Sequence, residues 1–168
     1  MKISMYDACV PSGIRMMNSL AVILEKAAAH AEAKKIDPTV LVNARLFPDM
    51  FPLLRQVQIA SDSAKAGAAR LIGLEPPPWE DNEKTLPELI ARAKKTVAYL
   101  ETLQPAQFDG SEDRTITWKS RATERSMQGE PYLVHQMLPN IYFHVTTAYN
   151  ILRHNGLELG KMDFLGGG

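Results

Sequence analysis

The segment between Asn140 and Gly156 constrains the fold of this chain more than any other stretch. Its apolar residues recur at three- and four-residue steps, and it ends in glycine, the residue most often found just after a helix. His144 lies between Ile141 and Ala148 at helical spacing, so its imidazole should point toward the apolar side of the helix. The segment therefore predicts a core helix that carries one buried histidine.

Other stretches of the chain also carry helix signals. Asp37 before Pro38, and Thr85 three residues before Glu88, are typical of helix starts. Pro139 should kink or interrupt the last helical segment, because proline lacks the N–H group and its ring clashes with the preceding turn. The predicted helical segments cover residues 6–34, 38–43, 51–73, 85–103 and 130–155.

A short β-hairpin is predicted before the last helical segment. Residues 114–119 and 122–128 alternate in polarity and contain β-branched side chains, with a turn across Ser120-Arg121. An isolated hairpin is marginally stable, so we expect Trp118 to anchor it on the helices. Together these elements predict an all-α fold, a four-helix bundle with a small β-hairpin before the last helix. Residues 1–168 should form a single domain.

Charge and cysteine content exclude several classes of function. Lysine and arginine number 19 and are balanced by 19 acidic residues, so we expect no nucleic-acid partner. The sequence contains no uncharged apolar run long enough to span a membrane. The N-terminus does not resemble a signal peptide. Cys9 is the only cysteine, and we expect a small buried hydrophobic residue rather than a nucleophile. A cytoplasmic location is the resulting expectation.

The segment from His144 to Gly156 resembles the final helix of the DinB/YfiT-like superfamily. The shared pattern is a histidine, a helical turn and an apolar run ending in Leu-Arg-x-x-Gly, here Leu152-Arg153-His-Asn-Gly156. The resemblance implies a DinB-like four-helix bundle. It also implies a divalent metal held by three histidines, one from the second helix and two spaced by four residues on the fourth.

This sequence departs from that histidine pattern at two of three positions. Four residues before His144 lies Asn140, and the second-helix position falls on Gln58, which precedes Ile59-Ala60. Four-residue spacing matters because it places two side chains on one helix face, where both reach one ion. Only His144 remains of the implied triad, so the sequence predicts a degenerate metal site.

Nearly the whole chain also looks like one uncharacterised branch of that superfamily, a domain of unknown function. Three blocks carry this likeness, and they read SMYDACVP from Ser4, NARLFPDMFPL from Asn43 and GKMDF from Gly160. The branch implies no particular activity. Some other members of the superfamily are thiol-dependent transferases.

Three interpretations of the residues around His144 stay open. The first is a polar network inside the bundle, in which the candidate partners are Gln58, Asn140 and Tyr142. The second is a small-molecule pocket built from the same groups. The third is a divalent metal, zinc or nickel, on His144, with a carboxylate from Asp62 one turn after Gln58.

Arg45 also belongs to the predicted ligand pocket, because it lies in a proline-containing connection together with Asp49. The two residues either line the pocket mouth and hold an anionic ligand, or form an ion pair that fixes the loop.

The leading functional hypothesis is a cytoplasmic bundle protein with a degenerate metal site that binds a small molecule or another protein. The alternative is a metal-dependent enzyme, such as a thiol-dependent transferase, that uses His144 as a ligand. A homodimer is a further hypothesis, because the alanine-rich second helix would suit close helix packing.

Overall fold

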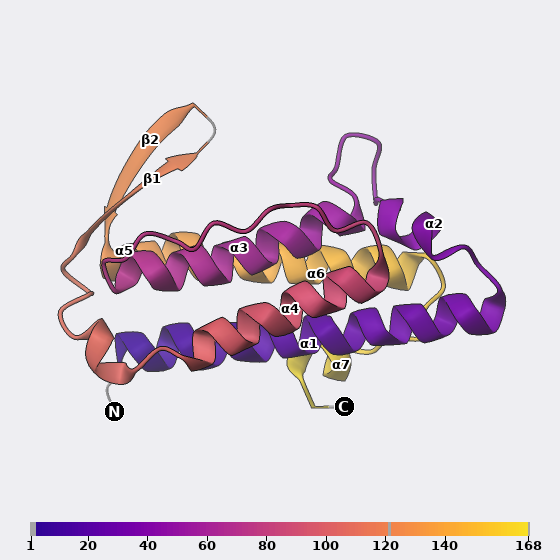
Figure 1. The fold of residues 1–168 in the computed structure, drawn as a ribbon, viewed down its shortest axis with the longest axis horizontal. Helices are drawn as coiled ribbons and strands as arrows, with labels where there is room; N and C mark the ends of the chain where they lie inside the picture. The colour runs from indigo at the N-terminus through magenta and orange to yellow at the C-terminus, as the bar shows by residue number, and fades with distance from the viewer. Residues whose placement is uncertain (1–2, 121, 168) are drawn as a thin grey trace.

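The computed structural model describes residues 3–120 and 122–167, which form a helical bundle beside a short hairpin (Figure 1). This confirms the all-α prediction with its small β-hairpin. The four long helices are α1 (Met5–Lys34), α3 (Leu53–Leu71), α4 (Leu86–Glu101) and α6 (Leu138–His154). A short helix, α2 (Pro38–Asn43), precedes α3.

The starts of α1, α2 and α4 are capped by side chains. The Ser4 side chain accepts a hydrogen bond from the backbone N–H of Asp7 at the start of α1. Asp37 caps α2, and Thr85 and Glu88 form a reciprocal capping box at α4. Each side chain pairs a backbone donor that would otherwise lack a partner in the first turn.

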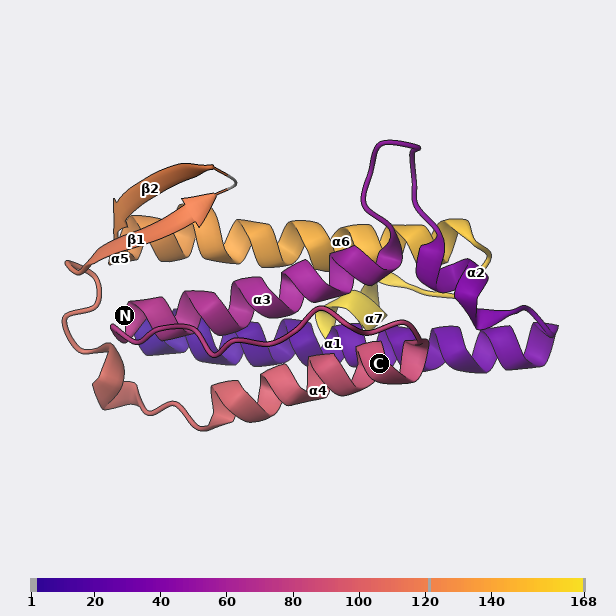
Figure 2. The same cartoon turned by 45° about the horizontal axis from the view of Figure 1, so that its top comes forward.

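The helices α1 and α6 run in one direction, and α3 and α4 run in the other. Because α3 and α4 are parallel, the linker of residues 72–85 must return along the whole bundle, which Figures 1 and 2 show as the thin trace beside α3 and α4. The helix α1 packs mainly against α4, and α3 packs mainly against α6. The long linker therefore covers the side of the bundle where α3 meets α4.

The hairpin pairs β1 (Thr115–Ser120) with β2 (Thr123–Gln128) in antiparallel register. Trp118 is 8% exposed and packs edge-on against Tyr132, with ring centroids 5.0 Å apart. The predicted anchor role of Trp118 is therefore confirmed. The predicted turn includes Arg121, which lies outside the described residues.

The last helical segment contains a local change of helix type. The helix α5 (Gly129–Tyr132) leads into a π turn, η2 (Leu133–Met137), and then into α6. Pro139 explains the irregularity, because it lacks an N–H group and its ring crowds the carbonyl four residues earlier. The chain absorbs this strain by widening the preceding turn rather than by ending the helix.

Two short elements were not predicted. The 3-10 turn η1 (Pro105–Phe108) follows α4, and α7 (Lys161–Leu165) lies against α1, where Lys26 pairs with Asp163 at 2.5 Å. Among the described residues, no helix is both long and apolar enough to cross a membrane.

The alanines of α3 lie inside the bundle rather than on its surface. Ala60, Ala64 and Ala68 are all fully buried. This row brings the neighbouring helices close to α3, and it is not available for the homodimer contact that the sequence suggested. The homodimer itself stays a prediction.

Candidate functional site

His144 lies on the inner face of α6 and is held by a glutamine of α3. Its Nδ1 is 2.6 Å from Oε1 of Gln56, whose Nε2 donates to the carbonyl of Phe51. Because the amide oxygen of Gln56 can only accept, Nδ1 of His144 carries the ring proton. Nε2 of His144 then bears the free lone pair. Burial and the nearby charge of Arg55 lower the pKa of His144 from 6.5 to about 4, which keeps the imidazole neutral at physiological pH.

The same seam between α3 and α6 continues toward the hairpin. Asn140 donates a hydrogen bond of 2.8 Å to the hydroxyl of Ser63. One turn further, Gly67 faces Met137, and a Cβ at position 67 would lie 2.4 Å from the sulfur. The lack of a side chain at Gly67 therefore makes room for Met137 between α3 and α6.

Gln58 does not face His144, which corrects the assignment made from the sequence. Its Oε1 accepts from Arg55 at 2.7 Å, and its Nε2 donates to Glu83 at 2.9 Å. Side chains two positions apart on an α-helix point in directions that differ by about 200°. Gln56 and Gln58 therefore point to nearly opposite sides of α3. Gln56 is the residue that occupies the position opposite His144.

Two facing polar rows enclose a groove of about 180 Å³ next to this seam. One row is Asp62–Ala66–Arg70 on α3, and the other is Tyr132–Gln136–Asn140 on α5, η2 and α6, each at four-residue steps. Trp118 of the hairpin closes the groove from one side. The structure therefore brings two predicted site residues, Asp62 and Asn140, into one small cavity.

Charged residues lie at both ends of this groove. Arg70 lies at one end, where its guanidinium donates to the Tyr132 hydroxyl at 3.2 Å. Asp62 lies at the other end, and the same oxygen, Oδ1, accepts from both Lys65 and Arg92. Gln136 belongs to the π turn, a helix type that is found frequently at functional sites.

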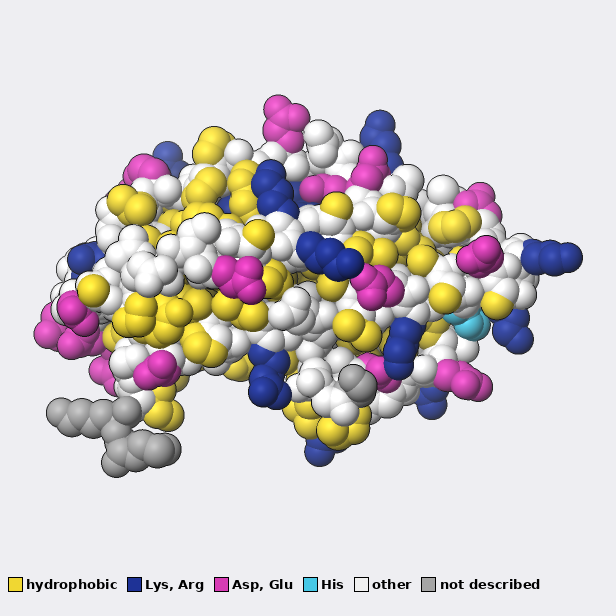
Figure 3. All heavy atoms as spheres, turned by 60° about the horizontal axis from the view of Figure 1, so that its bottom comes forward, with side chains coloured by type: hydrophobic (Ala, Val, Ile, Leu, Met, Phe, Trp, Pro, Cys, Tyr) yellow, Lys and Arg dark blue, Asp and Glu magenta, His cyan; other side chains and the backbone are white. Residues whose placement is uncertain are grey.

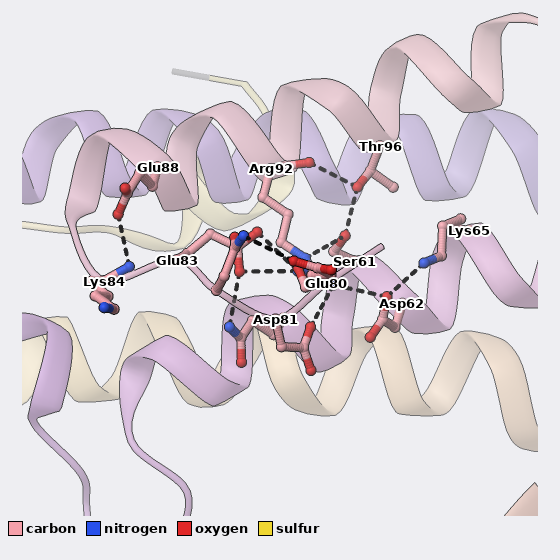
Figure 4. Close-up of polar contacts among 12 residues, drawn as sticks. Ser61, Asp62, Lys65, Glu80, Asp81, Glu83, Lys84, Glu88, Arg92 and Thr96 are labelled. Carbon is pink, nitrogen blue, oxygen red and sulfur yellow. Dashed lines mark hydrogen bonds and ion pairs between the residues drawn. The ribbon is translucent and has the colours of Figure 1, made fainter. Parts of the chain in front are cut away.

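A buried arginine of α4 fixes the linker across α3 (Figure 4). The Arg92 side chain is 2% exposed and reaches carboxylates of Asp62, Asp81 and Glu83, all at 2.9 Å. Its Nε also donates to Ser61. Burial opposes the charged form, but the carboxylate partners outweigh it and raise the pKa of Arg92 above its ordinary value. We call Arg92 and these three carboxylates the clamp.

Aromatic contacts reinforce the clamp. Trp79 of the linker lies between the ammonium groups of Lys65 and Lys95, at 4.4 Å and 4.3 Å from its ring centroid. Such cation–π contacts stabilise a partly exposed ring by about 0.5–1 kcal/mol each. The linker is therefore a fixed wall of the bundle rather than a loose tether.

The remaining predicted site residues lie away from both His144 and the groove. Tyr142 is 39% exposed on the outer side of α6. Arg45 is exposed and donates to the carbonyls of Pro48 and Met50 in its own loop. It therefore fixes the loop, through carbonyls rather than through the ion pair with Asp49 that we considered.

Cys9 is fully buried against Met137. Desolvation raises the pKa of its thiol to about 12. The thiolate form is therefore absent at physiological pH, which agrees with the predicted role as a small buried hydrophobic residue.

The side chains around His144 do not fit the three-histidine metal site that the resemblance implies. Gln56 is committed to His144 and Phe51, and Asn140 presents its N–H group to Ser63. Within residues 3–120 and 122–167, no three His, Cys, Asp or Glu side chains gather closely enough to hold an ion. A single imidazole with neutral amides is a poor site for zinc or nickel.

Sequence reasoning missed Arg92, although a signal for it exists. Arg92 and Thr96 lie within the apolar stripe formed by Leu89, Ala93 and Val97. A charged residue in such a stripe is expected to be buried and paired. Two of its three acidic partners, Asp81 and Glu83, stand in the run Trp-Glu-Asp-Asn-Glu that follows the prolines of the linker.

A family model described as "Domain of unknown function (DUF1993)" matches residues 5–165. The fold is similar to a crystal structure of a DinB family member protein from Shewanella denitrificans, with 45% sequence identity and a TM-score of 0.90. That similarity covers 96% of this chain and 91% of the other. No curated protein matches the chain.

Proposed function

This chain belongs to the DUF1993 family and has a DinB-like fold, and from that premise we propose that it is a small-molecule-binding protein with a degenerate metal site. The proposed site is the groove between α3 and α6 beneath the hairpin. Its ligand is a small zwitterion that carries a carboxylate and an amine. The observation that supports this most directly is the placement of Arg70 and Asp62 at its two ends.

The dimensions of the groove limit the size of the ligand. A volume of about 180 Å³ is below the range of about 300–1,000 Å³ usual for drug-sized ligands. Arg70 follows Asp62 by eight residues, which corresponds to about 12 Å along the helix axis. A groove of this volume suits a molecule of amino-acid size.

The chemistry of the lining supports the same ligand class. A guanidinium forms a charge-assisted pair with a carboxylate, so Arg70 is the group for the acidic end. At the other end, Oδ1 of Asp62 already pairs with Lys65 and Arg92, so its negative charge is compensated, and an amine would bind there as a hydrogen-bond donor to Oδ2. Gln136 and Asn140 supply neutral hydrogen bonds between the two ends.

The test is calorimetric titration with 4-aminobutyrate, with butyrate and butylamine as matched ligands that lack one charge. We expect the zwitterion to bind and Arg70→Gln to weaken it at least about tenfold, since a hydrogen bond to a charged group contributes about 1.5–3 kcal/mol. Arg15→Gln, on the opposite side of the bundle, is the control and should leave this binding unchanged. Equal binding of butylamine and 4-aminobutyrate would contradict the role of Arg70.

One observation favours the alternative of a metal-dependent enzyme. Metal-ligating histidines usually donate their other ring N–H to an oxygen, and His144 does this toward Gln56. Elemental analysis of protein purified without chelator separates the two proposals. About one zinc or nickel per chain would support the enzyme, whereas none after incubation with excess metal would leave the small-molecule function.

A further inference from the structure

A second groove lies on the opposite side of the molecule, between α1 and the C-terminal residues that follow α6. It measures about 530 Å³, which is within the range usual for ligand sites. Figure 3 brings this side of the bundle forward and shows hydrophobic side chains gathered on it among scattered charges. Neither the metal pattern nor the groove between α3 and α6 accounts for this feature.

The walls of the groove are apolar toward the start of α1. Tyr6, Val10 and Ile14 follow one another at four-residue steps along one face, with Pro11 beside them. Eight residues of helix rise about 12 Å, so the apolar wall extends about 12 Å along α1. A wall of this length suits an unbranched apolar chain that lies along the helix.

The lining becomes polar one turn later. Ser19 is 2% exposed and lines the groove, yet its hydroxyl has no hydrogen-bond partner among the described residues. A buried hydroxyl without a partner costs about 1–3 kcal/mol, and a ligand atom with a lone pair would remove this cost. Gly166 passes above Ser19, and a Cβ there would lie 3.1 Å from the hydroxyl. Glycine at position 166 therefore avoids a close contact with this hydroxyl.

The charges at this polar end favour an anion. The guanidinium of Arg15 donates one hydrogen bond to the carbonyl of Leu165 and has further N–H groups. Asp163 is paired with Lys26 at 2.5 Å, so its charge is compensated. Arg15, Lys26 and Asp163 together carry a net charge of +1.

We propose that this groove binds a monocarboxylate with an unbranched apolar chain. The chain lies against Tyr6, Val10 and Ile14, and the carboxylate accepts hydrogen bonds from Arg15 and Ser19. The site is independent of the groove between α3 and α6, because it uses different helices and different residues.

The test is calorimetric titration with decanoate, with decanol as the uncharged ligand of the same chain length. We expect decanoate to bind one per chain and decanol to bind at least tenfold more weakly. Arg15→Gln and Ser19→Ala should each weaken decanoate binding, Arg15→Gln by at least tenfold, and Arg70→Gln should leave it unchanged. Arg15 is exposed, so its substitution should not unfold the protein, and circular dichroism will check this.

Three results would overturn the proposal. Equal binding of decanol and decanoate would show that the polar end does not recognise an anion. No binding, together with a solution mass of two chains, would mean that a second copy covers the groove. Co-sedimentation with vesicles that contain oleic acid, without binding of free decanoate, would mean that the groove recognises a lipid surface instead.

Discussion

Replacing Arg92 with methionine should destabilise the protein by leaving carboxylates without their shared cation. Methionine keeps much of the volume but removes every donor. Asp62 retains Lys65, and Asp81 retains Arg55. Glu83 is the carboxylate that suffers most, because its side chain is 12% exposed and Arg92 is its ion-pair partner in the described structure.

The expected loss of unfolding free energy depends on which carboxylates keep another cation. Removing one member of a buried ion pair costs about 3–5 kcal/mol. Only one of the three carboxylates is both largely buried and left without a cation, so we expect the lower end, about 3 kcal/mol. For a chain of this length, each kcal/mol shifts the melting temperature by about 2–4 °C. Arg92→Met should therefore lower the melting temperature by about 6–12 °C.

Urea unfolding followed by tryptophan fluorescence measures this loss, since Trp79 lies on the linker that the clamp fixes. The matched control is the double variant Arg92→Met with Glu83→Gln, which removes the unpaired charge but keeps its shape. It should regain about half of the lost stability. A loss below about 1 kcal/mol for Arg92→Met, or no recovery in the double variant, would refute the reasoning.

Two further predictions concern His144. Its pKa is about 4 in the folded protein and 6.5 in the reference state, so the unfolded chain binds more protons between these values, and acid lowers stability. The free energy of unfolding should fall by about 2 kcal/mol between pH 7 and pH 5. His144→Gln should lose this part of the pH dependence, and an unchanged urea profile would contradict the burial argument. Separately, Gln56→His with Asn140→His should create a zinc site that raises the melting temperature. Gln58→His with Asn140→His should not, and the reverse result would mean that the seam is misassigned.

The helical skeleton could be predicted because local signals determine it. Ser4, Asp37 and Thr85 each cap a helix through their own side chains, and these signals act over three residues or fewer. The direction of α4 could not be predicted, since nothing local specifies that residues 72–85 run back along the bundle. That path depends on Arg92 and on acidic residues that are distant from it in sequence.

The candidate site was harder to predict because it depends on helix phase rather than on residue type. The family-like run placed Gln58 opposite His144, but Gln58 shares its helix face with Asp62 and Lys65 and turns toward the linker. The neighbouring Gln56 lies one turn before Ala60, which is fully buried. Gln56 lies on the same helix face as the buried alanines, and this spacing would have identified it as the partner of His144. The resemblance to the family motif pointed to Gln58 instead.

The seam between α3 and α6 keeps these two helices aligned through direct side-chain contacts. In a three-histidine site, an ion would link the two helices and fix their register. Here Gln56 with His144, and Ser63 with Asn140, link the same helices through hydrogen bonds. Gly67 packs closely against Met137 in this register. Because these contacts satisfy the buried polar groups directly, α3 and α6 need no ion to stay aligned, and the groove beside them is available for another ligand.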